Sequence, residues 1–318
     1  MNAATETSES FAAPATAPRP VRPFYWSVRR ELWENRSLFI APLVAGGIAI
    51  VALILNAMHL DEGMQMLSAL DPDRQRAIVT GIYAGIAFLI TWVMAITGFF
   101  YLLDALHGER KDRSVLFWKS MPVSDTTTVV SKLFTVMAVA PAIVIAVTIV
   151  TQVVVLLLAS VILMIGGASP GPIWSNLQLF QLTIALVYGQ IAVALWYAPV
   201  AAWVLFVSAW AKRVPILWAV LTPVAVMLFE RVAIGTHYMQ DLLGYRLRDG
   251  LKLAFGPRSR SEFSLGDGGV NATELPRRVF DALDPVAFFS NPWLWVGLVV
   301  AAGLITAAIW MRRYREPL

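Results

Sequence analysis

The sequence predicts an all-α integral membrane protein with six transmembrane helices. Of its 318 residues, 58% are hydrophobic and only 14% are charged, and the mean hydropathy is +0.66. A soluble domain carries about a quarter charged residues, so this composition is typical of a protein in a bilayer. Several apolar runs reach the roughly 20 residues that a helix needs to cross the hydrocarbon core. Such a segment must be helical, because lipid leaves its backbone no other hydrogen-bond partners.

The six predicted spans follow the apolar runs, at 38–58, 78–103, 129–165, 179–208, 214–234 and 291–311. A helix rises 1.5 Å per residue, so the third run is too long for one straight crossing. We expect it to begin in the cytoplasm and to bend near Pro141. Pro199 and Pro223 predict kinks or local unwinding in the fourth and fifth spans.

Lysine and arginine residues indicate the orientation. They gather before the first span, in the second and fourth connections and at the C-terminus, whereas the first connection is net acidic and the third is uncharged. The positive-inside rule therefore places both termini of this multi-pass protein in the cytoplasm. The connection at 235–290 is long and mixed in charge, and long connections obey this rule weakly.

Composition also excludes several kinds of site. The chain has no cysteine, which removes disulfides, thiolate catalysis and cysteine-ligated metals. Its net charge of +4 reflects orientation signals rather than a nucleic-acid surface. Residues 1–23 lack the basic and apolar regions of a secretory signal, and we interpret them as a disordered cytoplasmic tail.

Residues 24–37, FYWSVRRELWENRS, predict an interfacial helix on the inner leaflet. Phe24, Val28 and Leu32 recur every four residues, while Arg29 and Arg30 fall largely elsewhere on the helical wheel. The tryptophans at 26 and 33 are placed to anchor at the headgroups. A simpler alternative is an aromatic belt that extends the first span.

The connection at 104–128 is longer and chemically denser than a plain connector needs to be. Glu109 to Lys119 can form a short helix, which Pro122 separates from the third span. Ser124 or Asp125 suits the N-cap of that span. Exposed apolar groups within charges predict a docking surface, although a positive-inside signal with incidental aromatics is the alternative.

These residues carry a resemblance to a known family. HGERKDRSVLFWKSMPVSDTTTVVSKL resembles the cytoplasmic segment between the second and third spans of type-2 ABC exporter permeases. Members commonly show a Glu-Arg pair, a short apolar stretch, a Leu-Pro-Val-Ser-like turn and then a lysine. The matching positions are Glu109-Arg110, Val115 to Trp118, Met121 to Ser124 (with Met in place of Leu) and Lys132. The six spans and the larger connection before the last span are also similar to that family.

The resemblance implies that 104–128 is a coupling helix, which docks on a separate ABC ATPase subunit through Glu109, Arg110, Phe117, Trp118 and Pro122. It also implies that 24–37 is a connecting helix beside it, with Arg29, Arg30 and Trp33 as its contact residues.

The chain itself contains no G-x-x-x-x-G-K-[ST] motif, so it is not expected to be an enzyme or to bind a cofactor directly. ATP and Mg would bind to the partner ATPase, and a homodimer or heterodimer of permeases would form the pathway.

Few polar residues interrupt the spans, and each has two interpretations. Gln152 and Gln190 line a pathway or make interhelical hydrogen bonds. Glu230 and Arg231 form an interfacial pair or part of a proton relay. The GxxxG of Gly81 and Gly85 permits close helix approach, within the protomer or across a dimer. So apolar a pathway favours an amphiphilic or hydrophobic substrate.

The predicted organisation is therefore a tail (1–23), a connecting helix (24–37), five spans with the coupling segment (38–234), an extracytoplasmic connection (235–290), and the sixth span with a cytoplasmic C-terminus (291–318). The main alternative to an exporter permease is a non-transporting membrane scaffold or assembly factor. An intramembrane enzyme is disfavoured because the three histidines are scattered and no H-E-x-x-H or G-x-S-x-G motif occurs. An ion channel is disfavoured because no span carries a polar stripe.

Overall fold

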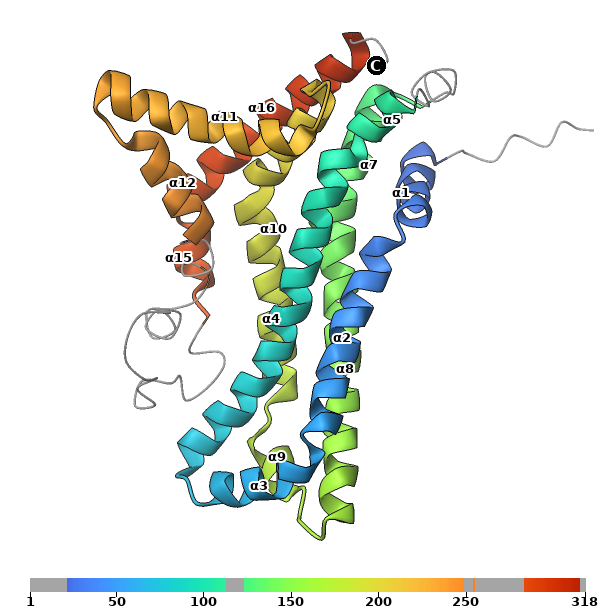
Figure 1. Cartoon of the computed structure of the whole chain (residues 1–318), viewed down its shortest axis with the longest axis vertical. Helices are drawn as coiled ribbons and strands as arrows, with labels where there is room; N and C mark the ends of the chain where they lie inside the picture. Colours follow the sequence, from blue (N-terminus) through green and yellow to red (C-terminus); the bar gives the residue numbers. More distant parts are fainter. Residues whose placement is uncertain (1–21, 113–122, 249–253, 255–282, 315–318) are drawn as a thin grey trace, which may run out of the picture.

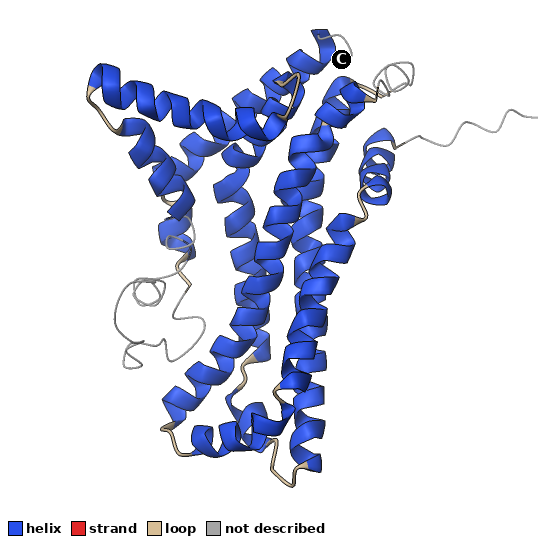
Figure 2. Ribbon diagram, viewed as in Figure 1, coloured by secondary structure: helices blue, strands red, loops and turns tan. Residues whose placement is uncertain are grey.

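The computed structural model describes residues 22–112, 123–248, 254 and 283–314. These ranges contain helices and loops and no strand, as Figure 2 shows. Six helical stretches within them are long and apolar enough to cross a membrane, which confirms the all-α class and the number of candidate spans. They are Ser37–Leu55, Pro72–Lys111, Asp125–Ile165, Leu179–Trp210, Pro215–Ile234 and Pro292–Tyr314.

Four long helical stretches lie side by side along the long axis of the molecule (Figure 1). They are built from α2 (Ser37–Leu55), α4 (Pro72–Ala105), α8 (Ala140–Ile165) and α10 (Leu179–Trp210). One end of this bundle carries α1 and the C-terminal end of α16, and we call it the α1 end. The opposite end, which carries α3 and α9, is the α3 end.

The third span is irregular where the sequence predicted it. Helix α7 (Asp125–Phe134) passes into α8 through a π-helical turn at Thr135–Val139, directly before Pro141. Proline has no N–H to donate, so the turn before it loses a regular hydrogen bond and rearranges. Ser124 is the N-cap of α7, and its hydroxyl accepts a 3.0 Å hydrogen bond from the amide of Thr127.

Prolines in the next two spans behave differently. Helix α10 continues through Pro199, and α11 (Pro215–Phe229) continues through Pro223, without a break in either helix. The local unwinding that these prolines predicted is therefore not found. In α10, the side chain of Arg246 donates to the backbone carbonyl of Trp196, in the turn before Pro199.

Helix α11 and the π-helical turn that follows it together have the length and composition of a span, but α11 runs crosswise to the four long helices at the α1 end (Figure 1). Val214, in the left-handed region at φ 44°, makes the sharp turn that redirects the chain after α10. Ala219 is the only buried residue of α11. The fifth predicted span therefore exposes nearly all of its apolar surface.

Short elements close the ends of the bundle. At the α3 end, the first connection forms η1 (Ala57–His59) and α3 (Leu60–Ser68), and the third forms α9 (Gly171–Asn176), none of which the sequence analysis predicted. After α11, the chain forms a π-helical turn at Glu230–Ile234 and then α12 (Tyr238–Arg248).

The last part of the chain contains α15 (Pro285–Phe289) and α16 (Pro292–Tyr314), and α16 packs extensively against α10. Most of the predicted tail (1–23) and the middle of the connection at 235–290 lie outside the described residues.

The buried apolar side chains form three clusters along the bundle. The largest gathers around Leu38, Ile90 and Leu205. A second, around Leu67 and Leu163, joins α3 to α4 and α8. The third packs Trp196 of α10 against Phe288 and Leu294, and it attaches the segment that follows α11. Because each cluster joins helices that are distant in sequence, the bundle is one packed unit.

Candidate functional site

A cluster of buried ionic side chains lies where five helices meet at the α1 end. Helices α1 (Pro23–Glu34), α4, α5 (His107–Lys111), α7 and α16 each contribute at least one member. We call these residues the charge cluster: Arg30, Glu31, Tyr101, Glu109, Asp125, Lys132 and Arg312.

At its centre, Glu31 of α1 faces Lys132 of α7. Lys132 Nζ lies 2.8 Å from Glu31 Oε1, and the two side chains are 3% and 2% exposed. The hydroxyl of Tyr101 donates a 2.8 Å hydrogen bond to the other carboxylate oxygen of Glu31. Buried charges persist when their partners satisfy them in this way, since neither ion can reach water. Glu31 is the only fully buried residue of α1, and its carboxylate holds this helix on the bundle together with the edge-to-face contact between Phe24 and Phe134 of α7.

Glu109 of α5 joins three cations from three other helices. Its Oε1 lies 2.9 Å from Arg30 Nη2 and 3.0 Å from Lys132 Nζ, and its Oε2 lies 2.5 Å from Arg312 Nη1. The Glu109 side chain is only 9% exposed. Arg312 also donates from Nε to Asp125 at 3.1 Å, so one guanidinium bridges α5 and α7. A planar guanidinium with several fixed N–H groups suits this double role.

The charges of this cluster balance. Three cations (Arg30, Lys132, Arg312) face three carboxylates (Glu31, Glu109, Asp125). Desolvation of so many ions is costly, and their mutual contacts offset that cost only while all partners are in place. Displacing α5 would remove Glu109 from Lys132 and Arg312 and leave each with one carboxylate partner, so motion of α5 is electrostatically tied to α1, α7 and α16.

Arg110, the neighbour of Glu109, fastens α5 to α10. Its guanidinium donates to the backbone carbonyls of Ala209 and Ala211 at the C-terminal end of α10, and the residue is 6% exposed. A cation at a helix C-terminus satisfies orphan carbonyls and complements the helix dipole. The Ser208 hydroxyl also accepts 3.0 Å hydrogen bonds from the amides of Leu106 and His107.

The predicted contact residues of the two helices therefore separate into inward and outward groups. Glu109, Arg110 and Arg30 make contacts inside the protomer. Arg29 stacks between Trp26 and Trp33, with its guanidinium 5.1 Å and 4.4 Å from the two ring centroids, on the outward face of α1. Both tryptophans are more than half exposed. Phe117, Trp118 and Pro122 lie outside the described residues.

The remaining predicted residues take packing roles or none within the protomer. Gln152 donates to the Tyr83 carbonyl at 3.0 Å, and Gln190 donates to the Thr91 hydroxyl at 2.8 Å, so both make interhelical hydrogen bonds. Gly81 and Gly85 face open space, since an added Cβ at either would meet nothing within 4 Å. The close helix approach within the protomer that GxxxG predicted is therefore wrong for this pair, and only the contact across a dimer stays open.

Glu230 also differs from its prediction. Instead of pairing with Arg231, its carboxylate accepts hydrogen bonds from the Thr236 hydroxyl at 2.8 Å and from the amides of Tyr238 and Met239 at 2.7 and 2.8 Å. These amides belong to the first turn of α12. The carboxylate thus caps that helix, as side-chain acceptors at a helix N-terminus do.

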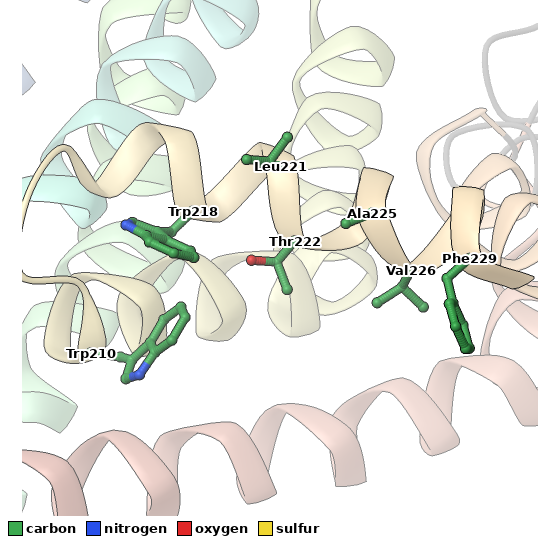
Figure 3. Close-up of a pocket in the computed structure, with 7 residues that line it drawn as sticks. All are labelled: Trp210, Trp218, Leu221, Thr222, Ala225, Val226 and Phe229. Carbon is green, nitrogen blue, oxygen red and sulfur yellow. The ribbon is translucent and has the colours of Figure 1, made fainter.

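A shallow apolar groove of about 410 Å³ runs along α11. Figure 3 shows Trp218, Thr222, Val226 and Phe229 on one side of this helix, with Trp210 of α10 at one end. The rings of Trp210 and Trp218 meet edge to face, with centroids 5.1 Å apart. Apart from the Thr222 hydroxyl, the side chains that line the groove offer hydrocarbon and indole surfaces, which suit an apolar ligand.

The sequence analysis did not assign a role to Glu31, Tyr101, Asp125 or Arg312 in such a cluster. One signal was present for Lys132, because a lysine inside an otherwise apolar run requires a buried partner. Its partner could not be named from spacing, since Glu31 lies 101 positions away. Among the described residues, no group of three or more His, Asp or Glu side chains is arranged to hold a metal ion.

Comparisons with protein-family models, with curated proteins and with solved structures give no match for this chain.

Proposed function

We propose that this chain is the permease subunit of an ABC exporter, which forms the transmembrane pathway and couples to a separate ATPase subunit. The observation that carries the proposal is the position of Glu109. It belongs to α5, directly before the connection 113–122, and it forms ion pairs with residues of α1, α7 and α16. A partner that moved this connection would therefore pull on three helices at once.

The second fastening strengthens this argument. Arg110 attaches α5 to the C-terminal end of α10. Together with the ion pairs of Glu109, this contact connects α5 to four helices (α1, α7, α10 and α16) besides α4, which precedes it. Phe117 and Trp118 would supply the apolar anchor on the ATPase, within a rim of charges. Glu109 and Arg110 would then act as transmission residues rather than as docking residues.

In this proposal the bound nucleotide and Mg belong to the ATPase, and the permease carries no cofactor. Both termini and the α1 end face the cytoplasm of the inner membrane, as the distribution of Lys and Arg favours. Two permease copies, identical or related, would form the pathway, and no nucleic acid is involved.

The substrate class follows from the apolar surfaces. Gln152 and Gln190 are engaged in helix packing, and the groove along α11 is lined almost wholly by apolar side chains. A pathway with so few free polar groups favours an amphiphilic or hydrophobic substrate, moved outward, over an ion.

The test is co-purification with ABC ATPase subunits from the same organism, followed by ATPase assays in liposomes. Docking and transmission separate in two variants. We expect Phe117→Asp to lower co-purification about tenfold, because a charge would replace the apolar anchor, as hot-spot losses of roughly 1.4 kcal/mol or more do. We expect Glu109→Gln to keep the complex but to change its ATPase rate.

Glu62→Gln is the matched control, since Glu62 lies on α3, at the opposite end of the bundle from the charge cluster, with a side chain that is 72% exposed. It should leave both measurements unchanged. If no ATPase co-purifies with the wild-type chain, or if neither Phe117→Asp nor Glu109→Gln differs from it, the exporter proposal is wrong. A non-transporting membrane scaffold then becomes the better interpretation.

A further inference from the structure

Arg246 of α12 lies at a junction with α10 and α16. Its Nη1 donates to the Trp196 carbonyl at 3.2 Å and its Nη2 donates to the Trp293 carbonyl at 2.9 Å. The guanidinium also lies over the Trp196 ring, 4.4 Å from the centroid, and the indole N–H of Trp196 donates to the Arg246 carbonyl at 2.8 Å. One arginine thus joins three helices by hydrogen bonds and a cation–π contact.

Two features of the neighbouring helices accommodate this side chain. Trp196 lies one turn before Pro199 in α10, and its carbonyl accepts the hydrogen bond from Arg246. Gly297 of α16 is buried, and a Cβ at that position would overlap the guanidinium of Arg246. A residue with a Cβ at 297 would therefore require the end of the Arg246 side chain to move. We call Arg246, Trp196, Trp293 and Gly297 the α12 latch.

Helix α16 connects this latch to the charge cluster. Trp293 and Gly297 lie in its first turns, and Arg312 lies in its last turn, where it binds Glu109 and Asp125. From Gly297 to Arg312 the helix extends about 22 Å at 1.5 Å per residue. Between them, Ala301 and Ala308 are buried and the larger side chains of Ile305 and Ile309 pack against the core, so the two ends provide the polar attachments of the helix.

We propose that Arg246 is a positioning residue that holds the segment after α11 on α10 and α16, and that the α12 latch and the charge cluster are coupled through α16. A helix is stiff over this length, so α16 cannot rotate or shift at one end without straining the contacts at the other. A role for this coupling in transport rests on the proposed function. Displacement of α5 by an ATPase would take Glu109 away from Arg312 and leave only Asp125 as its partner, and α16 would carry that change to the α12 latch.

The coupling can be measured in the permease alone. The chain has no cysteine, so two introduced cysteines carry spin labels without interference. Leu242 on α12 and Val299 on α16 are exposed, and labels there report the distance across the latch by pulsed electron paramagnetic resonance. We expect one narrow distance peak for the otherwise wild-type protein. Gly297→Ala should displace the Arg246 guanidinium and broaden or shift that peak, whereas Gly303→Ala on the same helix, where an added Cβ meets nothing, should keep it.

Arg312→Gln, at the far end of α16, tests the coupling itself. We expect it to broaden or shift the peak at the latch, while Arg313→Gln, an exposed neighbour, leaves the peak unchanged. A second label pair on α2 and α4, at Leu43 and Ile82, verifies that each variant keeps the bundle. Should Gly297→Ala not fold, Arg246→Lys serves instead, because it keeps the charge but loses the fork that reaches two carbonyls.

An unchanged peak in both Gly297→Ala and Arg246→Lys would show that there is no latch. An unchanged peak in Arg312→Gln would show that the two ends of α16 are independent. Neither outcome depends on an ATPase, so this inference and the exporter proposal fail separately.

Discussion

Glu31 and Lys132 lie 2.8 Å apart inside the α1 end of the bundle, although 101 positions separate them in the sequence. Their pairing explains how α1, which has no other fully buried residue, is held against α7. It also explains why a lysine is stable within the third candidate span, since each charge is the chief compensation for the burial of the other.

This pairing predicts a large loss of stability when one partner is removed. Glu31→Gln would leave Lys132 with less of its compensating charge in a buried site, and breaking a buried ion pair typically costs about 3–5 kcal/mol. The free energy of unfolding, measured by denaturant titration of the detergent-purified protein, checks this value. Glu62→Gln, at an exposed position of α3, should change it by less than about 0.5 kcal/mol, as exposed substitutions usually do. A double variant, Glu31→Gln with Lys132→Met, should recover part of the loss, and no recovery would contradict the pairing.

The two contacts of Arg312 predict that even a conservative substitution at this position lowers the stability of the protein. Lysine at this position would keep the charge, but a single ammonium cannot reproduce two guanidinium contacts, one from Nη1 to Glu109 and one from Nε to Asp125. We expect Arg312→Lys to lower the free energy of unfolding by about 1–3 kcal/mol, the usual cost of an unsatisfied buried polar group. The same denaturant titration measures it, and Arg313→Lys should behave like the wild-type protein. Equal stability of Arg312→Lys and the wild type would mean that the bridge contributes nothing.

Much of the architecture follows from patterns that the sequence displays locally. Apolar runs locate the six candidate spans, because length and hydropathy alone determine whether a helix can cross hydrocarbon. Ser124 as an N-cap and the irregular turn before Pro141 follow from the chemistry of one or two residues. The direction of α11 could not be predicted, since a rare left-handed backbone at Val214 determines it.

The charge cluster could not be predicted from local patterns either, because its members come from different helices. The sequence predicts Glu109 and Arg110 as contact residues in a connection, but their partners come from α1, α7, α10 and α16. Which of several arginines and lysines faces which carboxylate depends on helix packing. A periodicity along one helix contains no information about it.

Gly46 provides a test of helix packing between α2 and α8. A Cβ at Gly46 would lie 2.5 Å from Thr151 Oγ1, whereas a Cβ at the adjacent Gly47 would meet nothing within 4 Å. Gly46→Ala should therefore destabilise the bundle by about 1–3 kcal/mol through overpacking. Gly47→Ala should be neutral or slightly stabilising, because alanine is the better helix former. Thermal unfolding of the two variants side by side makes the comparison, and a loss of equal size in both would refute close packing at Gly46.

Substitutions of Gln152 and Gln190 distinguish a role in helix packing from a role in transport. Each donates a hydrogen bond to a neighbouring helix, and such bonds within membranes contribute on average about 0.6 kcal/mol. Gln152→Leu and Gln190→Leu should each cost about that amount in denaturant unfolding, because the lost hydrogen bond is the only polar interaction removed. Neither should alter the ATPase rate of the complex with its partner, since a packing residue does not contact the substrate. A variant that kept its stability but changed that rate would show that the glutamine lines the pathway. A polar pathway residue would also count against an apolar substrate.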